Sequence, residues 1–219
     1  MVQKFRELVG AERRSRELHE ALRKRPRAEL LAMLRQQMAR AAEPKADEPE
    51  LVLLCVARLL GELHGPEVVD SLIDILGCRH PLSKLEAGEQ LQGLALEHFP
   101  DVADGVERAL QRLPADNSAL VELPYLLVDT QHPDVTALLG KALGHSHPDV
   151  VAAAIEALAA FGDPAAIELL EPLRRDSRRS TLGDEDEGER LEATVGELCE
   201  DAIELLSAVP GAEEAAGGR

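Results

Sequence analysis

Four prolines recur at nearly equal spacing, and each opens a similar apolar segment. They are Pro66, Pro100, Pro133 and Pro164, separated by 34, 33 and 31 residues. Self-similarity at a period of about 20 to 50 residues is typical of repeat architectures, in which each unit buries its apolar face only against its neighbours. The chain is therefore expected to fold as a linear array of similar units.

The spacing of apolar residues within each repeat predicts a helix. Counted from each proline, positions +2, +6 and +9 hold Val68, Leu72 and Ile75; Val102, Val106 and Ala109; Val135, Leu139 and Ala142; and Ala166, Leu170 and Leu173. Offsets of four and three residues place these positions on one helix face. Proline suits a first helical turn, where its missing N–H is not needed. Each segment is therefore interpreted as the second helix of a hairpin.

A first helix is expected ahead of each proline. The ranges are about 49–63, 82–98, 117–130 and 148–161, and a fifth candidate at 192–206 would close the array. Pro124 falls inside the third of these ranges, where it should kink the helix. No run of alternating β-branched residues indicates a strand, so the predicted fold class is all-α.

One segment carries a recognisable family pattern. Residues 147–170 read HPDVVAAAIEALAAFGDPAAIELL: an opening Pro-Asp, an alanine-rich first helix, a Gly-Asp-Pro turn and an Ile/Leu-rich second helix. This pattern resembles the short bacterial HEAT-like repeats of the PBS-lyase type. The resemblance implies a right-handed α-solenoid of HEAT-like helical hairpins, whose second helices line the concave side. It also implies a scaffold or adaptor that works through protein–protein interaction.

Charge divides the chain into unlike parts. Residues 1–45 hold 12 Lys+Arg and 6 Asp+Glu, a net charge of +6. Because the whole chain has a net charge of −17, residues 46–219 have a net charge of −23. We expect a basic N-terminal helical pair over 1–45, at about 2–24 and 27–42, that caps the array. The repeat array then covers 46–207 with an acidic insertion at about 176–190, and 208–219 is expected to be a flexible tail.

The composition of the chain disfavours several classes of function. A charge of −17 argues against nucleic-acid binding by the whole molecule, because phosphates attract cationic surfaces. Aromatic residues make up only 2% of the chain, which disfavours base-stacking platforms and aromatic cofactor cavities. The longest apolar run, Leu51–Ala57, is too short to cross a bilayer, and the first residues lack a signal-peptide pattern.

The three cysteines are widely separated, which suits a reducing cytosol and a cytoplasmic protein. Cys55 and Cys199 lie on apolar helix faces and are expected in the core.

No motif for catalysis or cofactor binding is found, so the chain is expected to be no enzyme and to need no cofactor. His64, His98 and His132 lie just before repeat prolines, but neighbouring turns about 10 Å apart are too distant for three imidazoles to share one metal ion. Iron-binding HEAT-like hydroxylases repeat a His-Glu pair, whereas this chain has only His19-Glu20. Cys78 and His80 supply two ligands where a closed zinc site needs four.

Acidic residues recur at the same register of the second helices and form the candidate binding site. The predicted partner-binding residues are Asp70, Asp74, Asp104, Glu107, Glu168 and Glu171. A negative strip of this kind would attract a basic segment of a protein partner, although a solvated helix face would carry similar charges.

The sequence leaves other hypotheses open for the N-terminal helices and for two serines. The basic N-terminal helices could bind nucleic acid or an anionic membrane, or pair with the acidic repeats of another copy. Ser177 and Ser180 follow arginine pairs in the manner of kinase sites. The sequence specifies neither the partner nor the oligomeric state.

Overall fold

The helices pair along the chain as the repeat predicts. The computed structural model describes residues 1–181 and 193–208, and over these residues the chain forms eleven α-helices, one short 3-10 helix and no strand. The helices are α1 (Val2–Arg23), α2 (Arg27–Ala41), α3 (Pro49–Leu60), α4 (Pro66–Leu76), α5 (Pro81–Glu97), α6 (Phe99–Arg112), α7 (Ala119–Val128), α8 (Val135–Ala142), α9 (Pro148–Phe161), α10 (Ala166–Leu170) and α11 (Val195–Ser207); the 3-10 helix spans Glu171–Leu173.

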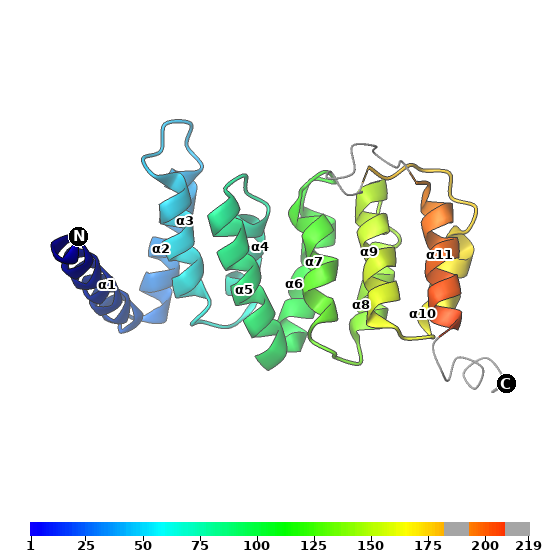
Figure 1. Cartoon of the computed structure of the whole chain (residues 1–219), viewed down its shortest axis with the longest axis horizontal. Helices are drawn as coiled ribbons and strands as arrows, with labels where there is room; N and C mark the ends of the chain where they lie inside the picture. The colour runs from blue at the N-terminus through cyan, green and yellow to red at the C-terminus, as the bar shows by residue number, and fades with distance from the viewer. Residues whose placement is uncertain (182–192, 209–219) are drawn as a thin grey trace.

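Two layers of helices build the array (Figure 1). The first helices α3, α5, α7, α9 and α11 stand side by side, and the second helices α4, α6, α8 and α10 lie behind them. The hairpin turns that join a first helix to its second helix lie along one edge, and most links to the next repeat lie along the opposite edge. This arrangement confirms the predicted all-α solenoid of helical hairpins.

The apolar register of the second helices forms the core, as predicted. Of the twelve residues at positions +2, +6 and +9, all but Leu173 are buried, and the core is continuous from Leu30 in α2 to Leu206 in α11. In the first layer, α9 buries its small residues Ala152, Ala153 and Ala154 completely. These side chains let the neighbouring helices approach closely, so one core runs through all the repeats.

The repeat prolines do not all occupy the same helical position. Pro66 is the first residue of α4 and Pro100 the second of α6, whereas Pro133 and Pro164 each precede the helix by two residues. Asp163 stabilises the last of these turns: its carboxylate accepts hydrogen bonds from the Ala165 N–H at 3.0 Å and from Thr136 Oγ1 at 2.6 Å. The Asp163 side chain thus holds the turn that leads into α10.

Two further prolines shorten helices late in the array. Pro124 is buried inside α7, which stays helical through it but spans only ten residues. Pro172 lies in the 3-10 turn that ends the second helix of the fourth hairpin, so α10 itself has five residues. Because the chain leaves the regular helix there, Leu173 at position +9 is only partly buried.

The two N-terminal helices behave differently. Leu30, Leu31 and Leu34 of α2 are buried in the core, and α2 packs on α3. By contrast, α1 has no buried residue. That α1 caps the array together with α2 therefore stays a prediction. The predicted tail at 208–219 and most of the acidic insertion lie outside the described residues.

Candidate functional site

Ion pairs connect successive second helices across the face formed by α4, α6, α8 and α10, which we call the second-helix face. Asp70 of α4 accepts two-pronged hydrogen bonds from Arg108 of α6, with Nη2 at 2.9 Å and Nε at 3.1 Å from Oδ1. One turn further along, Asp74 pairs with Arg112 at 2.8 Å. Glu107 of α6 pairs with Lys141 of α8. We call these three pairs the inter-repeat ladder.

The ladder lies at the surface. Asp70 and Arg108 are 32% and 38% exposed, and the other two pairs are at least as open. Pairs this exposed contribute about 0–1 kcal/mol each, because water screens the charges and the long side chains lose entropy. Their effect is therefore mainly to neutralise charge on the face.

The six predicted partner-binding residues separate into two groups. Asp70, Asp74 and Glu107 belong to the ladder, and Glu171 pairs with Arg174 at 3.4 Å. Asp104 and Glu168 are exposed, and no ion pair joins either one to another residue of the described chain. The negative strip is thus weaker than a count of acidic residues predicts, and its unneutralised charge lies at two points.

These two carboxylates share one register. Asp104 and Glu168 are both four residues after a repeat proline, on α6 and α10, and the same position on α8 between them is the exposed Ala137. The small side chain leaves the surface open between the two acids. With neighbouring helices about 8–10 Å apart, two helix steps separate the carboxylates by roughly 20 Å.

The three histidines that precede repeat prolines lie near the hairpin turns in two separate ring contacts. The rings of His64 and His98 have centroids 5.3 Å apart, closer than the predicted spacing of the turns, while His132 stacks on Phe99 at 3.8 Å. The value of 5.3 Å is a distance between imidazole rings and does not measure the spacing of the turns. Within the described residues, no group of three His, Cys, Asp or Glu side chains could hold a metal ion.

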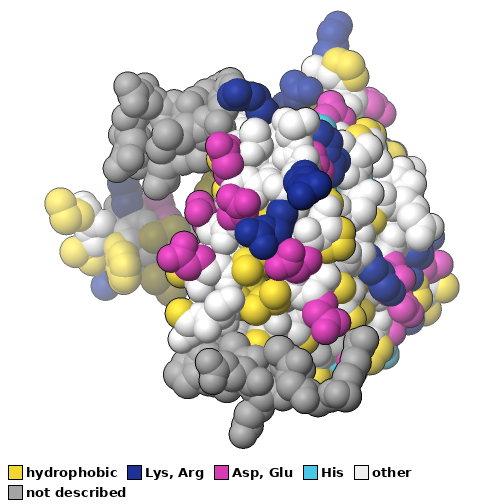
Figure 2. Space-filling view, turned by 90° about the vertical axis from the view of Figure 1, so that its right-hand side faces the viewer, with side chains coloured by type: hydrophobic (Ala, Val, Ile, Leu, Met, Phe, Trp, Pro, Cys, Tyr) yellow, Lys and Arg dark blue, Asp and Glu magenta, His cyan; other side chains and the backbone are white. Residues whose placement is uncertain are grey.

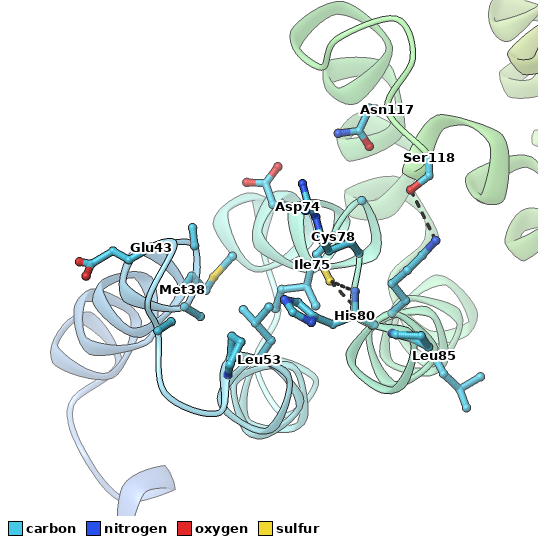
Figure 3. Close-up of a pocket in the computed structure, with 18 of the residues that line it drawn as sticks. Met38, Glu43, Leu53, Asp74, Ile75, Cys78, His80, Leu85, Asn117 and Ser118 are labelled. Carbon is cyan, nitrogen blue, oxygen red and sulfur yellow. Dashed lines mark hydrogen bonds between the residues drawn. The ribbon is translucent and has the colours of Figure 1, made fainter.

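A groove lies at the edge opposite the hairpin turns, where links join one repeat to the next, and was not predicted from the sequence. It has a volume of about 1350 Å³ and is bordered by the turns before α3, α5 and α7, with Met38, Leu53 and Ile75 in its wall (Figure 3). Lys84 reaches across it to Ser118 Oγ at 3.4 Å and also pairs with Glu122. Because three separate turns build the groove, no local motif in the sequence indicates it.

The segment that follows the 3-10 helix is fastened to α9. Asp149 accepts hydrogen bonds from Ser180 Oγ at 2.9 Å and from the Thr181 N–H at 2.8 Å. Burial alone would raise the pKa of Asp149, but these bonds and the nearby His147 outweigh it, so the pKa lies below its usual value. Ser180 is fully buried in this contact, whereas Ser177 is exposed. Of these two serines, Ser177 is therefore the one whose side chain is accessible.

The cysteines differ in environment. Cys199 is buried in α11, and burial, with a smaller contribution from Asp176, raises the pKa of its thiol to about 11. Cys55 is exposed on α3, so the prediction that it lies in the core is wrong. It lies across the helix from the buried Leu53 and Leu60.

The far end of the array carries a polar surface. Figure 2 looks at the α11 end and shows acidic and basic side chains mixed around a small hydrophobic group. Glu197, Glu200, Asp201 and Glu204 are exposed on α11, and Arg174 lies 3.7 Å from Glu200. Terminal units of a solenoid need such a polar outer face, so α11 serves as a C-terminal cap of the described array.

Comparison with known proteins agrees with the geometry. Residues 106–185, which include α7 to α10, match the family of HEAT repeats. The chain is an α-solenoid, and the hairpins α3/α4 and α5/α6 continue the arrangement of the matched region. Residues 106–185 are thus a region of HEAT-like repeats.

Two solved structures are similar to it at low identity. Human deoxyhypusine hydroxylase in complex with glycerol is 23% identical with a TM-score of 0.42, over 82% of this chain and 62% of that chain. An engineered protein is 18% identical with a TM-score of 0.32, over 89% of each chain. This chain thus spans 62% of the hydroxylase chain. None of the curated proteins matches it.

Among the described residues, no helix is both long and apolar enough to cross a membrane. HEAT repeats generally mediate protein–protein interaction, and the second-helix face is the surface on which the predicted binding residues lie.

Proposed function

We propose that this chain is a non-enzymatic adaptor or scaffold that binds a protein partner on its second-helix face. The observation that carries the proposal is the pair of exposed carboxylates, Asp104 and Glu168, which share one register on either side of Ala137. The inter-repeat ladder neutralises the acids around them. A partner would meet two separated negative points on an otherwise mixed-charge surface.

This geometry suits a short basic segment. An extended chain covers at most about 3.3–3.6 Å per residue, so roughly six residues would span the distance between the two carboxylates. A partner with two Lys or Arg residues at that spacing could contact both acids over the small Ala137. Charge complementarity of this kind raises the association rate and restricts partner choice. That this face is the concave side of the array stays a prediction.

Charge reversal at the two points tests the proposal. Asp104→Lys together with Glu168→Lys should remove partner binding and leave the fold intact, because both side chains are exposed and carry no ion pair among the described residues. The matched control is Glu89→Lys with Glu97→Lys, which makes the same charge change at exposed positions of α5 in the first layer. Asp70 is unsuitable, since reversing it would place two cations together in the ladder.

The readout is quantitative affinity capture from native extract with the full chain and both variants. Proteins retained by the wild type and the α5 control, but lost from the Asp104/Glu168 variant, would support the proposal. Equal retention by all three would refute it. Tight, salt-sensitive binding of duplex DNA by the full chain would also contradict it and favour the nucleic-acid alternative.

A further inference from the structure

The first helix projects from the array with its apolar side chains in solvent. Phe5, Leu8 and Leu18 are 65%, 64% and 66% exposed. Ion pairs tie α1 to the array at its C-terminal part, where His19 and Arg23 lie 2.5 and 3.0 Å from Glu62 in the turn after α3. The N-terminal half of α1 therefore extends beyond the solenoid (Figure 1).

Over residues 2–10, the exposed residues are sorted by type around the helix. At about 100° per residue, Phe5, Leu8 and Val9 fall within an arc of about 100°. Lys4 and Arg6 lie beside the two borders of the arc, and Glu7 lies on the far side. One turn further along, Glu12 falls within the same arc as the apolar residues and pairs with Arg16 at 3.0 Å. An apolar arc bordered by cations is typical of a helix that lies in a membrane interface, where Lys and Arg stems extend to the lipid phosphates.

The net charge of α1 favours one kind of binding partner for its apolar and basic surface. Residues 1–25 contain eight Lys and Arg and four Glu, so their net charge is 8 − 4 = +4. Two copies of α1 would repel each other through these charges. Duplex DNA would attract the cations but would leave Phe5 and Leu8 without a role. An anionic bilayer satisfies both the charge and the apolar arc.

We propose that α1 binds the surface of an anionic lipid bilayer. Phe5, Leu8 and Val9 enter the boundary between headgroups and acyl chains, while Lys4 and Arg6 contact lipid phosphates. Residues 46–219 have a net charge of −23, so the anionic surface repels the array and α1 carries it at a distance from the membrane. The second-helix face then stays available to a partner.

Vesicle flotation with the full chain tests this assignment. Wild type should float with phosphatidylcholine vesicles that contain phosphatidylglycerol, bind pure phosphatidylcholine vesicles much more weakly, and dissociate as salt rises. Phe5→Ser with Leu8→Ser should weaken binding at least about tenfold, since two exposed apolar side chains would no longer be buried. The control is Leu85→Ser with Leu96→Ser, which removes two α5 side chains that are each 63% exposed.

Selective loss in the α1 variant would support the proposal. It would be overturned if wild type failed to float, if the α1 variant floated like wild type, or if both double variants lost binding equally. Sedimentation velocity and duplex-DNA gel shifts on the same proteins identify the alternatives. Without flotation, a dimer that only the α1 variant loses would assign the helix to a second copy, and DNA binding that survives in that variant would assign it to nucleic-acid phosphates.

Discussion

At the scale of single residues, Asp149 connects the regular array to the segment that follows it. Its carboxylate, in the first turn of α9, receives three hydrogen bonds from Ser180 and Thr181 at 2.8 to 2.9 Å. The sequence predicts Asp149 as a helix-opening acid, which is correct. It could not predict these contacts, because their donors lie 31 and 32 residues later and follow no repeat spacing.

Asp149→Asn should lower the free energy of unfolding by about 1–2 kcal/mol, because charge-assisted hydrogen bonds from Ser180 and Thr181 would be weakened or lost. Urea unfolding followed by circular dichroism measures the change. Asp101→Asn is the matched control: it removes an acid from the first turn of α6 and so subtracts the helix-dipole effect. Equal losses in both variants would show that the contacts to Ser180 and Thr181 contribute nothing.

The same carboxylate gives the expected pH dependence. The pKa of Asp149 in the folded chain lies below its ordinary value of 3.8, so the unfolded chain binds the proton more readily. Its contribution to stability is therefore fully present well above pH 3.8 and is lost as pH falls through the folded pKa. The stability difference between wild type and Asp149→Asn should shrink toward zero in that acidic window.

At the scale of helices, α6 packs closely on α4 at one glycine. Gly105 is buried there, and a Cβ atom at this position would lie 2.3 Å from Val69 Cγ1. Val69 is buried and β-branched, so it has little freedom to turn away. Gly93 on α5 is exposed, and a Cβ there would meet no atom within 4 Å.

These two glycines predict opposite effects of alanine. Gly105→Ala should destabilise the protein by about 1–3 kcal/mol through overpacking, although alanine favours the helix. Gly93→Ala should stabilise it by roughly 0.5–1 kcal/mol through helix propensity alone. Chemical denaturation of both variants provides the comparison. A stabilising Gly105→Ala would mean that α4 and α6 can separate without cost.

The helices themselves follow from local patterns in the sequence. The register of Val68, Leu72 and Ile75 and its counterparts depends on residues three and four positions apart, which is information that a single helix contains. The groove beside Met38 and Ile75 depends instead on three turns from different repeats. Local periodicity contains no information about how such turns meet, so the groove was not predicted.

At the scale of the whole molecule, the ladder explains why the acidic strip is weaker than predicted. Asp70 and Asp74 pair with Arg108 and Arg112, which lie one repeat later and one helical turn further from the repeat proline. A comparison of equal register positions misses these pairs, because Asp70 at +4 joins Arg108 at +8 and Asp74 at +8 joins Arg112 at +12. The prediction of charge on this face therefore needs the lateral offset between neighbouring helices.

The thermal stability of the solenoid should depend little on α1, and this is also testable at the scale of the whole molecule. Removal of residues 1–24 deletes no buried side chain and, among the described residues, breaks the surface ion pairs of His19 and Arg23 with Glu62. Such pairs contribute about 0–1 kcal/mol each. Since 1 kcal/mol shifts the Tm of a chain of this size by roughly 2–4 °C, the truncated protein should melt within a few degrees of wild type.

Leu34→Ala in α2 is the contrasting variant. Leu34 is 1% exposed, and its truncation should cost about 2–5 kcal/mol and lower the Tm by roughly 4 °C at least. Thermal melts by circular dichroism compare the two proteins directly. If deletion of α1 lowers the Tm as much as Leu34→Ala does, then α1 stabilises the array and its exposed face is not reserved for an outside partner. Retained stability together with lost vesicle binding would separate the folding role of α2 from the binding role of α1.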